Sequence, residues 1–188
     1  MDDHLTLYLL RHGETAWTLS GQHTGVTDLP LGEAGQAQAL RLKNKLQTIS
    51  FAKIFSSPRK RALQSAELSG FQPQIEPLAV EWDYGNYEGL TSQEIWKKDP
   101  HWELFKDGAP GGESLSQITE RADLLLNKLM HEKGTIALFS HGHFSRVLAA
   151  RWIGLSSEWG RHFALGVASI SILGYERNGR VIRLWNEL

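Results

Sequence analysis

The chain has 188 residues, of which 41% are hydrophobic and 22% charged, and its formal net charge is -1. These totals are typical of a globular protein and predict a single domain over residues 1–188. A charge so close to zero favours no nucleic-acid partner, and the lack of cysteine excludes disulfides, thiolate metal sites and cysteine nucleophiles. No apolar run approaches the roughly 20 residues that span a bilayer, so we expect no membrane partner. The acidic start, Met1-Asp2-Asp3, is unlike a signal peptide and favours a cytoplasmic location.

The first predicted element is a buried strand over residues 5–10, which ends in Arg11, His12 and Gly13. In an open α/β sheet the ligand crevice lies at the carboxyl ends of the strands, so this end is a candidate site. An ordinary polar turn is the alternative at this point. Residues 16–31, rich in Gly, Ser, Thr, Asp and Pro, predict a long structured loop, and such loops are often functional.

The next part of the chain alternates helices with short strands. Apolar residues at helical spacing predict a helix over residues 36–48, and residues 51–55 predict a strand that ends in a second polar cluster. Pro58 fits the first turn of the helix that follows. Residues 75–81 predict a third extended segment, with Glu81 at its end.

Residues 82–112 are rich in glycine and aromatic residues and have little periodicity, so we predict a cap-like insertion over a pocket. A strong amphipathic helix begins at Glu113 and ends before Gly134. The apolar strand over residues 135–139 then ends in a third polar cluster, Ser140-His141-Gly142-His143. A helix and two closing strands complete the chain.

This alternation predicts an α/β fold, a three-layer α/β/α sandwich whose central sheet is mostly parallel, with an antiparallel edge and a small cap insertion. If the three strands with polar ends are neighbours, Arg11, Arg59, His12 and His141 meet in one crevice. A planar guanidinium suits bidentate contact with phosphate oxygens, and backbone near Gly142 adds further donors. The sequence therefore predicts a trap for a phosphoryl group.

Such a trap also needs a nucleophile and an acid. An imidazole attacks only when it is neutral, and its ordinary pKa of about 6.5 balances both forms near cellular pH. Arg11 and Arg59 are expected to lower the pKa of His12 and keep the ring neutral. Glu81 is the candidate that protonates the leaving alcohol, and Asp83 is its rival.

Each of these residues also has an ordinary structural explanation. Arg59 can lie at a solvated helix start, and Glu81 can be a surface or salt-bridged residue. His141 and His143 could bind a metal, but no carboxylate lies at a helical ligand spacing beside them, so none is expected. The tryptophans fit core and cap packing because no basic stretch is interleaved with them.

Three motifs together resemble the histidine phosphatase superfamily, also called the phosphoglycerate mutase-like family: Leu10-Arg11-His12-Gly13-Glu14-Thr15, Ser56-Ser57-Pro58-Arg59-Lys60-Arg61-Ala62 and Ser140-His141-Gly142-His143. The resemblance covers nearly the whole chain and implies an α/β sandwich with a phosphate pocket over the sheet. It implies that His12 is phosphorylated in the intermediate and that Glu81 is the proton donor. The phosphoryl group is expected to bind Arg11, Arg59, His141 and Gly142, with no metal and no other cofactor.

The superfamily contains both phosphatases and mutases. Cofactor-dependent phosphoglycerate mutases carry a longer insertion after the acidic motif, with paired arginines for a second anionic group. Residues 89–112 of this chain contain Lys97, Lys98 and Lys106 and no arginine, which favours a phosphatase. A phosphate-binding protein without catalysis is a further alternative, but the nucleophile, arginines, second histidine and acid are all present.

Residues 20–31 and 81–89 are similar to the sugar-phosphate branch of the superfamily, which includes sedoheptulose-bisphosphatase-like enzymes. Gln22, His23 and Thr24 are therefore candidates for the substrate side of the pocket. The resulting prediction is a metal-independent phosphomonoesterase that acts on a small phosphorylated metabolite, a sugar phosphate, through a phosphohistidine. A cofactor-dependent phosphoglycerate mutase is the alternative.

Overall fold

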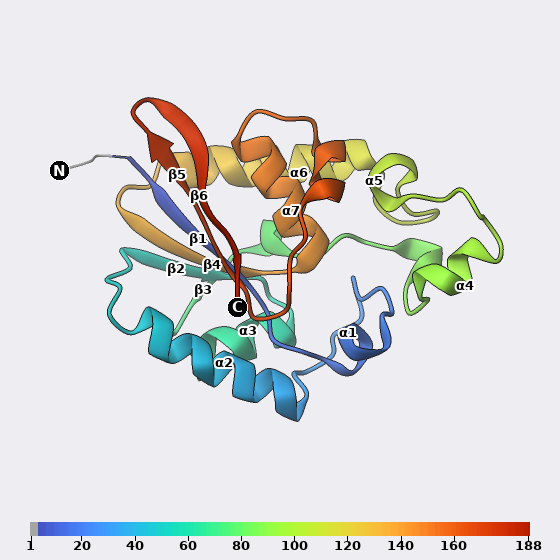
Figure 1. Cartoon of the computed structure of the whole chain (residues 1–188), viewed down its shortest axis with the longest axis horizontal. Helices are drawn as coiled ribbons and strands as arrows, with labels where there is room; N and C mark the ends of the chain where they lie inside the picture. Colours follow the sequence, from blue (N-terminus) through green and yellow to red (C-terminus); the bar gives the residue numbers. More distant parts are fainter. Residues whose placement is uncertain (1–3) are drawn as a thin grey trace.

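The computed structural model describes residues 4–188, in which six strands form one sheet (Figure 1). The acidic start, Met1-Asp2-Asp3, lies outside the described residues. The spatial order of the strands is β3-β2-β4-β1-β5-β6; β1 to β4 are parallel, and β5 and β6 are antiparallel. The prediction of a mostly parallel sheet with an antiparallel edge is confirmed. The strands are β1 (Thr6–Arg11), β2 (Lys53–Ser56), β3 (Gln74–Ile75), β4 (Thr135–Ser140), β5 (Ile170–Glu176) and β6 (Gly179–Glu187).

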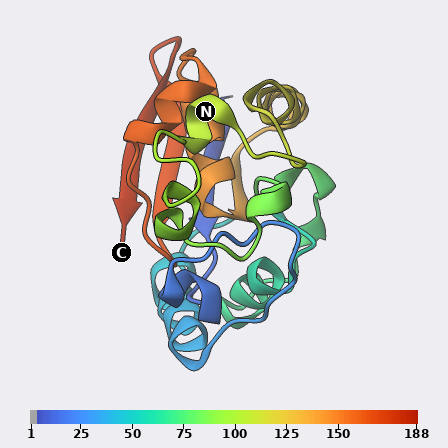
Figure 2. The ribbon, with the colours of Figure 1, turned by 90° about the vertical axis from the view of Figure 1, so that its right-hand side faces the viewer.

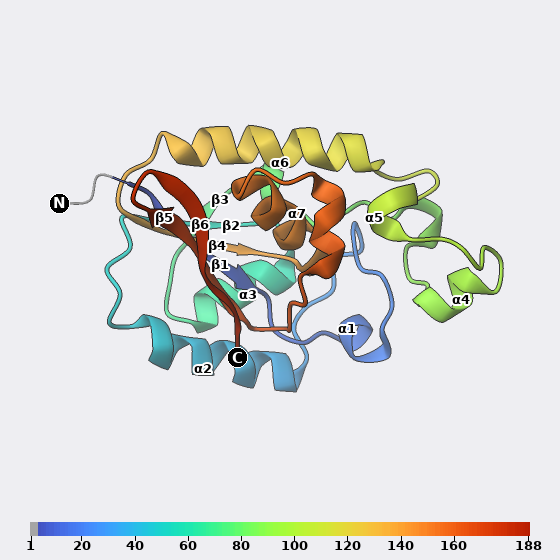
Figure 3. The same cartoon turned by 45° about the horizontal axis from the view of Figure 1, so that its top comes forward.

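Helices cover both faces of this sheet, as Figure 3 shows. One face carries α2 (Glu33–Leu46) and α3 (Lys60–Leu68), and the other carries α6 (Leu115–Met130) and α7 (Gly142–Trp152). The predicted three-layer sandwich is therefore confirmed. Among residues 4–188, no helix combines the length and the apolar character that a membrane span requires.

The shorter helices gather beyond the carboxyl ends of the central strands (Figure 1). They are α1 (Ala16–Ser20), α4 (Ser92–Trp96) and α5 (Leu104–Asp107). Figure 2 looks onto this end of the molecule, where the green segment that contains α4 and α5 crosses in front of the strands. Residues 82–112, predicted as a cap-like insertion, thus lie at the end of the sheet where its polar strand ends emerge.

Alternate side chains of the central strands pack into opposite layers. In β1, Leu7 and Leu9 belong to the core on the side of α6 and α7, whereas Leu10 belongs to the core on the side of α2 and α3. In β4, Leu138 and Phe139 divide in the same way. Successive strand side chains point to opposite faces, so a continuous apolar run suits a strand that is covered on both.

The register of the parallel strands brings their polar ends together. Arg11 pairs with Ser140, and Ser56 pairs with Phe139. The next residues continue this alignment: His12 N donates to Ser140 O at 3.1 Å, and Ser57 N donates to Phe139 O at 3.0 Å. The prediction that the three polar clusters meet at one edge is confirmed.

The predicted third extended segment is wrong beyond Ile75. A 3-10 helix, η1 (Pro77–Ala79), begins almost at once. Pro77 has no N–H for strand pairing, and the Glu76 side chain accepts a hydrogen bond from Leu78 N at 3.1 Å, which caps the turn. Glu81 therefore lies in irregular backbone and not at a strand end.

Helix boundaries also differ from the predicted ones. The helix α2 begins at Glu33, earlier than the predicted residue 36, because apolar spacing reports the buried face and misses a polar first turn. Pro58 lies outside α3, since Arg59 is the residue that precedes the helix. The predicted loop over residues 16–31 contains the short helix α1.

The loop after β1 packs directly on the start of α2. A Cβ atom on Gly13 would lie 2.4 Å from Gly35 O, and a Cβ atom on Gly35 would lie 2.0 Å from Glu14 O. Both distances are far shorter than a van der Waals contact, so only glycine fits at these two positions. The close approach fixes the backbone that immediately follows His12.

We expect Gly35→Ala to destabilise the protein by roughly 1–3 kcal/mol, because the new methyl group overlaps Glu14 O. A loss of stability is informative, because replacing glycine by alanine inside a helix normally stabilises the helix by about 1 kcal/mol. Urea denaturation measures the free energy of unfolding, and Gln36→Ala, at an exposed position of the same helix, is the control. Equal stability of the two variants would contradict the close approach.

Candidate active site

A cavity of about 240 Å³ opens at the carboxyl end of β1. Its walls come from the loop after β1, from residues 81–92, from the first turns of α7 and from the loop before β5. The lining residues are Arg11, His12, Thr18, Gly21, Gln22, His23, Thr24, Glu81, Tyr84, Ser92, Gly142, His143, Arg146 and Leu165. Most predicted site residues are thus brought together, whereas Arg59, His141 and Asp83 are not among the lining residues.

His12 is buried, and one hydrogen bond defines the proton on its ring. Nδ1 lies 2.7 Å from Gly13 O, and since a carbonyl only accepts, Nδ1 donates and the neutral ring keeps a free lone pair on Nε2. Burial lowers the pKa of His12 well below its usual value, and the positive charges of Arg61 and Arg11 lower it further. His12 is therefore a neutral imidazole at cellular pH.

Arg61 is the arginine of the second cluster that contacts a histidine, and sequence reasoning missed it. Its fully buried guanidinium donates from Nε to His141 Nδ1 at 3.2 Å. The other nitrogens donate to the carbonyls of Thr24, Gly25 and Thr27 at 3.0–3.2 Å. Helical spacing could have found it, because Arg61 lies four residues before the buried Ser65, on the same face of α3.

Arg59 takes a different position from the one expected. It is half-buried at the start of α3, and its Nε is buried without a hydrogen-bond partner among the described residues. Its charge contributes to lowering the pKa of His141, after burial and after Arg61. Arg59 is thus close to the histidine pair, and its role as a phosphate ligand stays a prediction.

His141 is fully buried next to His12, with the two rings edge to face and their centroids 5.2 Å apart. Its Nδ1 accepts from Arg61, so the proton of the neutral ring is on Nε2, which donates to Ser57 Oγ at 2.8 Å. Burial, together with Arg61, lowers the pKa of His141 well below its usual value. Both histidines are therefore neutral within a strongly positive environment.

Arg11 lines the cavity beside His12. Nη1 donates to Leu165 O, and the buried Nε has no hydrogen-bond partner among the described residues. A Cβ atom on Gly142 would lie 3.2 Å from Nε and Cζ of Arg11, so the glycine leaves the room that this guanidinium occupies. Arginine stays protonated in proteins, and Arg11 therefore places a fixed positive charge at the cavity.

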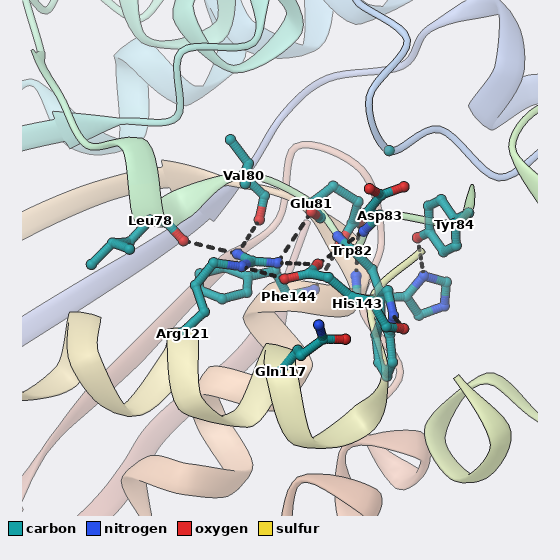
Figure 4. Close-up of polar contacts among 12 residues, drawn as sticks. Leu78, Val80, Glu81, Trp82, Asp83, Tyr84, Gln117, Arg121, His143 and Phe144 are labelled. Atoms are coloured by element: carbon teal, nitrogen blue, oxygen red, sulfur yellow. Dashed lines mark hydrogen bonds and ion pairs between the residues drawn. The ribbon is translucent and has the colours of Figure 1, made fainter. Parts of the chain in front are cut away.

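The Glu81 carboxylate is bound at the N-terminus of α7 (Figure 4). Oε1 accepts from Phe144 N at 2.8 Å and from Trp82 N at 2.9 Å, and Oε2 accepts from His143 N at 3.0 Å. Free N–H groups and the helix dipole attract a carboxylate at such a position. Asp83 instead accepts from Gly85 N at 2.9 Å, outside the cavity lining, so the geometry favours Glu81 as the acid.

The loop that carries Gln22, His23 and Thr24 is tied to the residues after Glu81. Gln22 Nε2 donates to Gly89 O at 2.7 Å, and His23 Nδ1 lies 2.7 Å from Leu90 O. Thr24 Oγ1 donates to Gln22 O at 3.2 Å. All three residues line the cavity, but they also use polar atoms to hold its wall together, and their contact with substrate stays a prediction.

His143 and Tyr84 form the part of the wall beside His23. The Tyr84 hydroxyl lies 2.5 Å from His143 Nδ1, and the His143 ring stacks on His23 with the ring centroids 6.1 Å apart. Burial lowers the pKa of His143 well below its usual value and raises the pKa of Tyr84. This wall is therefore polar but uncharged at neutral pH.

Comparison with known proteins places the chain in a family. Residues 7–188 match the histidine phosphatase superfamily (branch 1). The chain belongs to this superfamily. It is 42% identical over 179 residues to an acid phosphatase of Mycobacterium tuberculosis (strain ATCC 25618 / H37Rv), which covers 93% of this chain and 88% of the relative.

Two further relatives agree with this assignment. The chain is 34% identical over 184 residues to the sedoheptulose 1,7-bisphosphatase of Saccharomyces cerevisiae (strain ATCC 204508 / S288c), covering 80% of this chain and 68% of the relative. A solved structure of an open reading frame product from Mycobacterium tuberculosis superimposes with a TM-score of 0.91 and 39% identity, covering 96% of each chain. This histidine phosphatase is a phosphoric monoester hydrolase with a phosphoglycerate mutase-like fold.

Arg146 is a second cavity arginine that sequence reasoning missed. Nε donates to Gly160 O at 2.9 Å, Nη2 donates to Arg161 O at 2.8 Å, and the guanidinium carbon lies 4.6 Å from the centroid of the Phe105 ring. Among residues 4–188, Nη1 of Arg146 has no hydrogen-bond partner. Its spacing from Gly142, four residues along α7, places both on one helix face and was the available signal.

We expect Arg61→Met to raise the pKa of His12, because a nearby buried cation disfavours protonation of the ring. In the wild type the lowered pKa keeps His12 neutral as the pH falls below about 6.5. The acid limb of the kcat/KM profile should therefore move to higher pH in the variant. An NMR titration of His12 checks the cause, and Lys60→Met, an exposed neighbour, is the control. An unshifted His12 titration would rule out this role of Arg61.

Proposed function

We propose that this histidine phosphatase is a metal-independent phosphomonoesterase that hydrolyses a small sugar phosphate through a phosphohistidine on His12. The observation that carries the proposal is the buried, neutral His12 ring, whose Nδ1 binds Gly13 O so that Nε2 is available to attack. Nucleophilic catalysis divides one difficult displacement into two easier ones. The arrangement supplies each group that the two steps need.

In the first step, Nε2 of His12 forms a bond to phosphorus while the ester P–O bond breaks. The leaving alcohol takes a proton from Glu81, the acid that lines the cavity. In the second step, water attacks the phosphohistidine, Glu81 recovers its proton from that water, and inorganic phosphate leaves. His12 returns to its starting form, so no other reactant is consumed.

The cations around His12 stabilise the transferred group. Phosphoryl transfer is accelerated mainly by positioning and by stabilising charge on the equatorial oxygens. Arg11 lines the cavity, whereas Arg61 and Arg59 lie behind it, around His141. We assign phosphate binding to Arg11, Arg59 and the N–H of Gly142. His141 joins them if its Nε2 proton turns from Ser57 Oγ to a phosphate oxygen when substrate binds, and Arg61 acts behind it by holding His141 Nδ1.

The positions of the cap lysines favour hydrolysis over mutase activity. These lysines are the cations of residues 89–112 that could bind a second anionic group. Lys97, Lys98 and Lys106 are exposed, and none of them lines the cavity. A mutase must retain a doubly charged intermediate until its phosphate returns, which requires strong binding at both ends. The cap segment supplies no cation to the cavity for this purpose.

A sugar phosphate is supported by the polar lining and by the name of the yeast relative, sedoheptulose 1,7-bisphosphatase. Thr18, Gln22 and Ser92 line the side of the cavity that adjoins the cap, and hydroxyl and amide groups suit a hydroxyl-rich molecule. Arg146 also lines the cavity, and its Nη1, which has no hydrogen-bond partner among residues 4–188, adds a charged donor. We propose that these groups bind the sugar.

We propose that the enzyme needs no metal ion and no other cofactor. Among residues 4–188, no group of three or more histidine, aspartate or glutamate side chains could hold a metal ion. Independence from metals and other cofactors, a cytoplasmic location and the lack of nucleic-acid and membrane partners all stay predictions. Chelator treatment and cell fractionation would test the first two.

We expect an acid-labile, base-stable phosphoryl group to be trapped on the wild-type enzyme and to be absent from His12→Ala. Rapid quenching after addition of a radiolabelled substrate measures the trapped group, and His162→Ala, an exposed histidine, is the control. Activity should survive EDTA. Labelling of His12→Ala would overturn the nucleophile, and a requirement for 2,3-bisphosphoglycerate in turnover would favour the mutase.

We expect kcat/KM across a panel of phosphorylated metabolites to be higher for sugar phosphates than for phosphoglycerates. Joint replacement of Gln22, His23 and Thr24 by alanine should change the ranking within the sugar phosphates, because these residues form one wall of the cavity. Replacement of the exposed Lys97 and Lys98 by alanine is the control. An unchanged ranking in the triple variant would remove these residues from substrate recognition.

A further inference from the structure

The backbone around Glu81 is held by side chains and not by regular secondary structure. Between η1, which ends at Ala79, and the 3-10 helix η2 (Gly85–Tyr87), the chain has no helical or strand residues. A catalytic carboxylate on such a segment needs another source of rigidity, because its position depends on every backbone torsion angle before it. Arg121, in the second turn of α6, supplies the contacts.

One edge of the Arg121 guanidinium donates hydrogen bonds to the main-chain carbonyls of Glu81 and of residues just before it (Figure 4). Nη1 donates to Leu78 O at 2.9 Å and to Val80 O at 2.8 Å, and Nη2 donates to Glu81 O at 3.2 Å. Three carbonyls within four residues thus converge on one rigid, planar group. The fork geometry of arginine suits this arrangement, and a lysine ammonium cannot reproduce it.

Glu113 holds the guanidinium from the other side and continues the network past Glu81. Its carboxylate accepts from Nε and Nη2 of Arg121 at 2.8 and 2.7 Å, a bidentate pair. The same carboxylate accepts from Asp83 N at 2.9 Å, and Glu113 O accepts from Trp82 Nε1 at 2.8 Å. The backbone is therefore fixed both before and after Glu81.

Arg121 also contacts the residue that binds the Glu81 carboxylate. Its guanidinium carbon lies 4.3 Å from the centroid of the Phe144 ring. Phe144 N is the donor that binds Glu81 Oε1 at 2.8 Å. The Arg121 side chain thus contacts two parts of the site. One is the main chain of Glu81, and the other is the N-terminal turn of α7 that binds the Glu81 carboxylate.

We propose that Arg121, held by Glu113, is a positioning residue that sets the Glu81 carboxylate at the cavity for proton transfer to the leaving alcohol. The inference rests on the proposed function, in which Glu81 is that acid. Neither Arg121 nor Glu113 lines the cavity, so neither touches the substrate. Their charges are paired with each other, and the effect on Glu81 is therefore one of position.

Dependence on the leaving group separates this role from a merely structural one. A 4-nitrophenyl phosphate releases a stable phenolate and needs little help from an acid, whereas an alkyl phosphate such as glycerol 3-phosphate must protonate its alcohol. The ratio of kcat/KM for the two substrates measures the contribution of the acid. A general loss of folded enzyme lowers both values equally and leaves the ratio unchanged.

We expect Arg121→Met to lower kcat/KM for the alkyl phosphate about 10²-fold relative to the aryl phosphate, because misplacement of a catalytic group by about 1 Å has an effect of this size. Arg121→Lys and Glu113→Gln should change the ratio in the same direction by a smaller factor. If Arg121→Met does not fold, as judged by near-UV circular dichroism, these two variants decide the question.

Arg151 provides a matched control. It forms a bidentate pair with Asp123 at 2.8 and 3.0 Å, and this pair also joins α7 to α6, but neither residue contacts Glu81. Arg151→Met should therefore lower the melting temperature and leave the substrate ratio at the wild-type value. Arg121 is a structural residue only, and the inference is overturned, if its variants behave in the same way.

Glu81→Gln distinguishes failure of this inference from failure of the proposed function. If Glu81 is the acid, Glu81→Gln lowers the alkyl kcat/KM about 10²–10⁴-fold and the aryl value far less. Such a result together with an unchanged ratio in the Arg121 variants overturns the positioning role alone. An unchanged ratio in Glu81→Gln overturns the acid itself, and with it the role of Arg121.

Discussion

The parallel pairing of β1 with β4 is the constraint on which the site depends. Because Arg11 pairs with Ser140, the next residue of each strand, His12 and His141, leaves the sheet at the same edge. Their rings then lie 5.2 Å apart, a proximity that no local sequence preference could produce. Both strands are buried on both faces, so a one-residue slip of register would turn each side chain into the opposite core as well as separate the histidines.

Burial and positive charge act in the same direction on this pair. Burial lowers the pKa of His12, and so do the charges of Arg61 and Arg11. The His12 ring is therefore neutral although cations surround it. Under the proposed function those same cations attract the phosphoryl group, so a single arrangement would bind the substrate and keep His12 neutral. The hydrogen bond from Nδ1 to Gly13 O completes it by orienting the ring, and the close contact of Gly13 with Gly35 fixes that carbonyl.

The acid is held in a different way from the nucleophile. His12 takes its position from the sheet, whereas Glu81 lies on irregular backbone that the Arg121 and Glu113 pair and the N-terminus of α7 hold in place. Residues 82–112, the predicted cap, follow Glu81 directly, so the proposed acid lies where the end of the sheet meets this segment.

The sequence by itself determined the sheet, its three polar strand ends and half of the residues that line the cavity, because apolar runs and the polar clusters after them are local patterns. Only the tertiary structure showed that Arg61 is the arginine that hydrogen-bonds His141, since this depends on which side of α3 faces that histidine. It also placed Glu81 and not Asp83 at the cavity, through contacts with α7 more than 60 residues away. Arg121 and Arg146 escaped prediction because most of their partners are backbone carbonyls that only the fold brings near; the spacing of Arg146 from Gly142 indicated a shared helix face and not a partner.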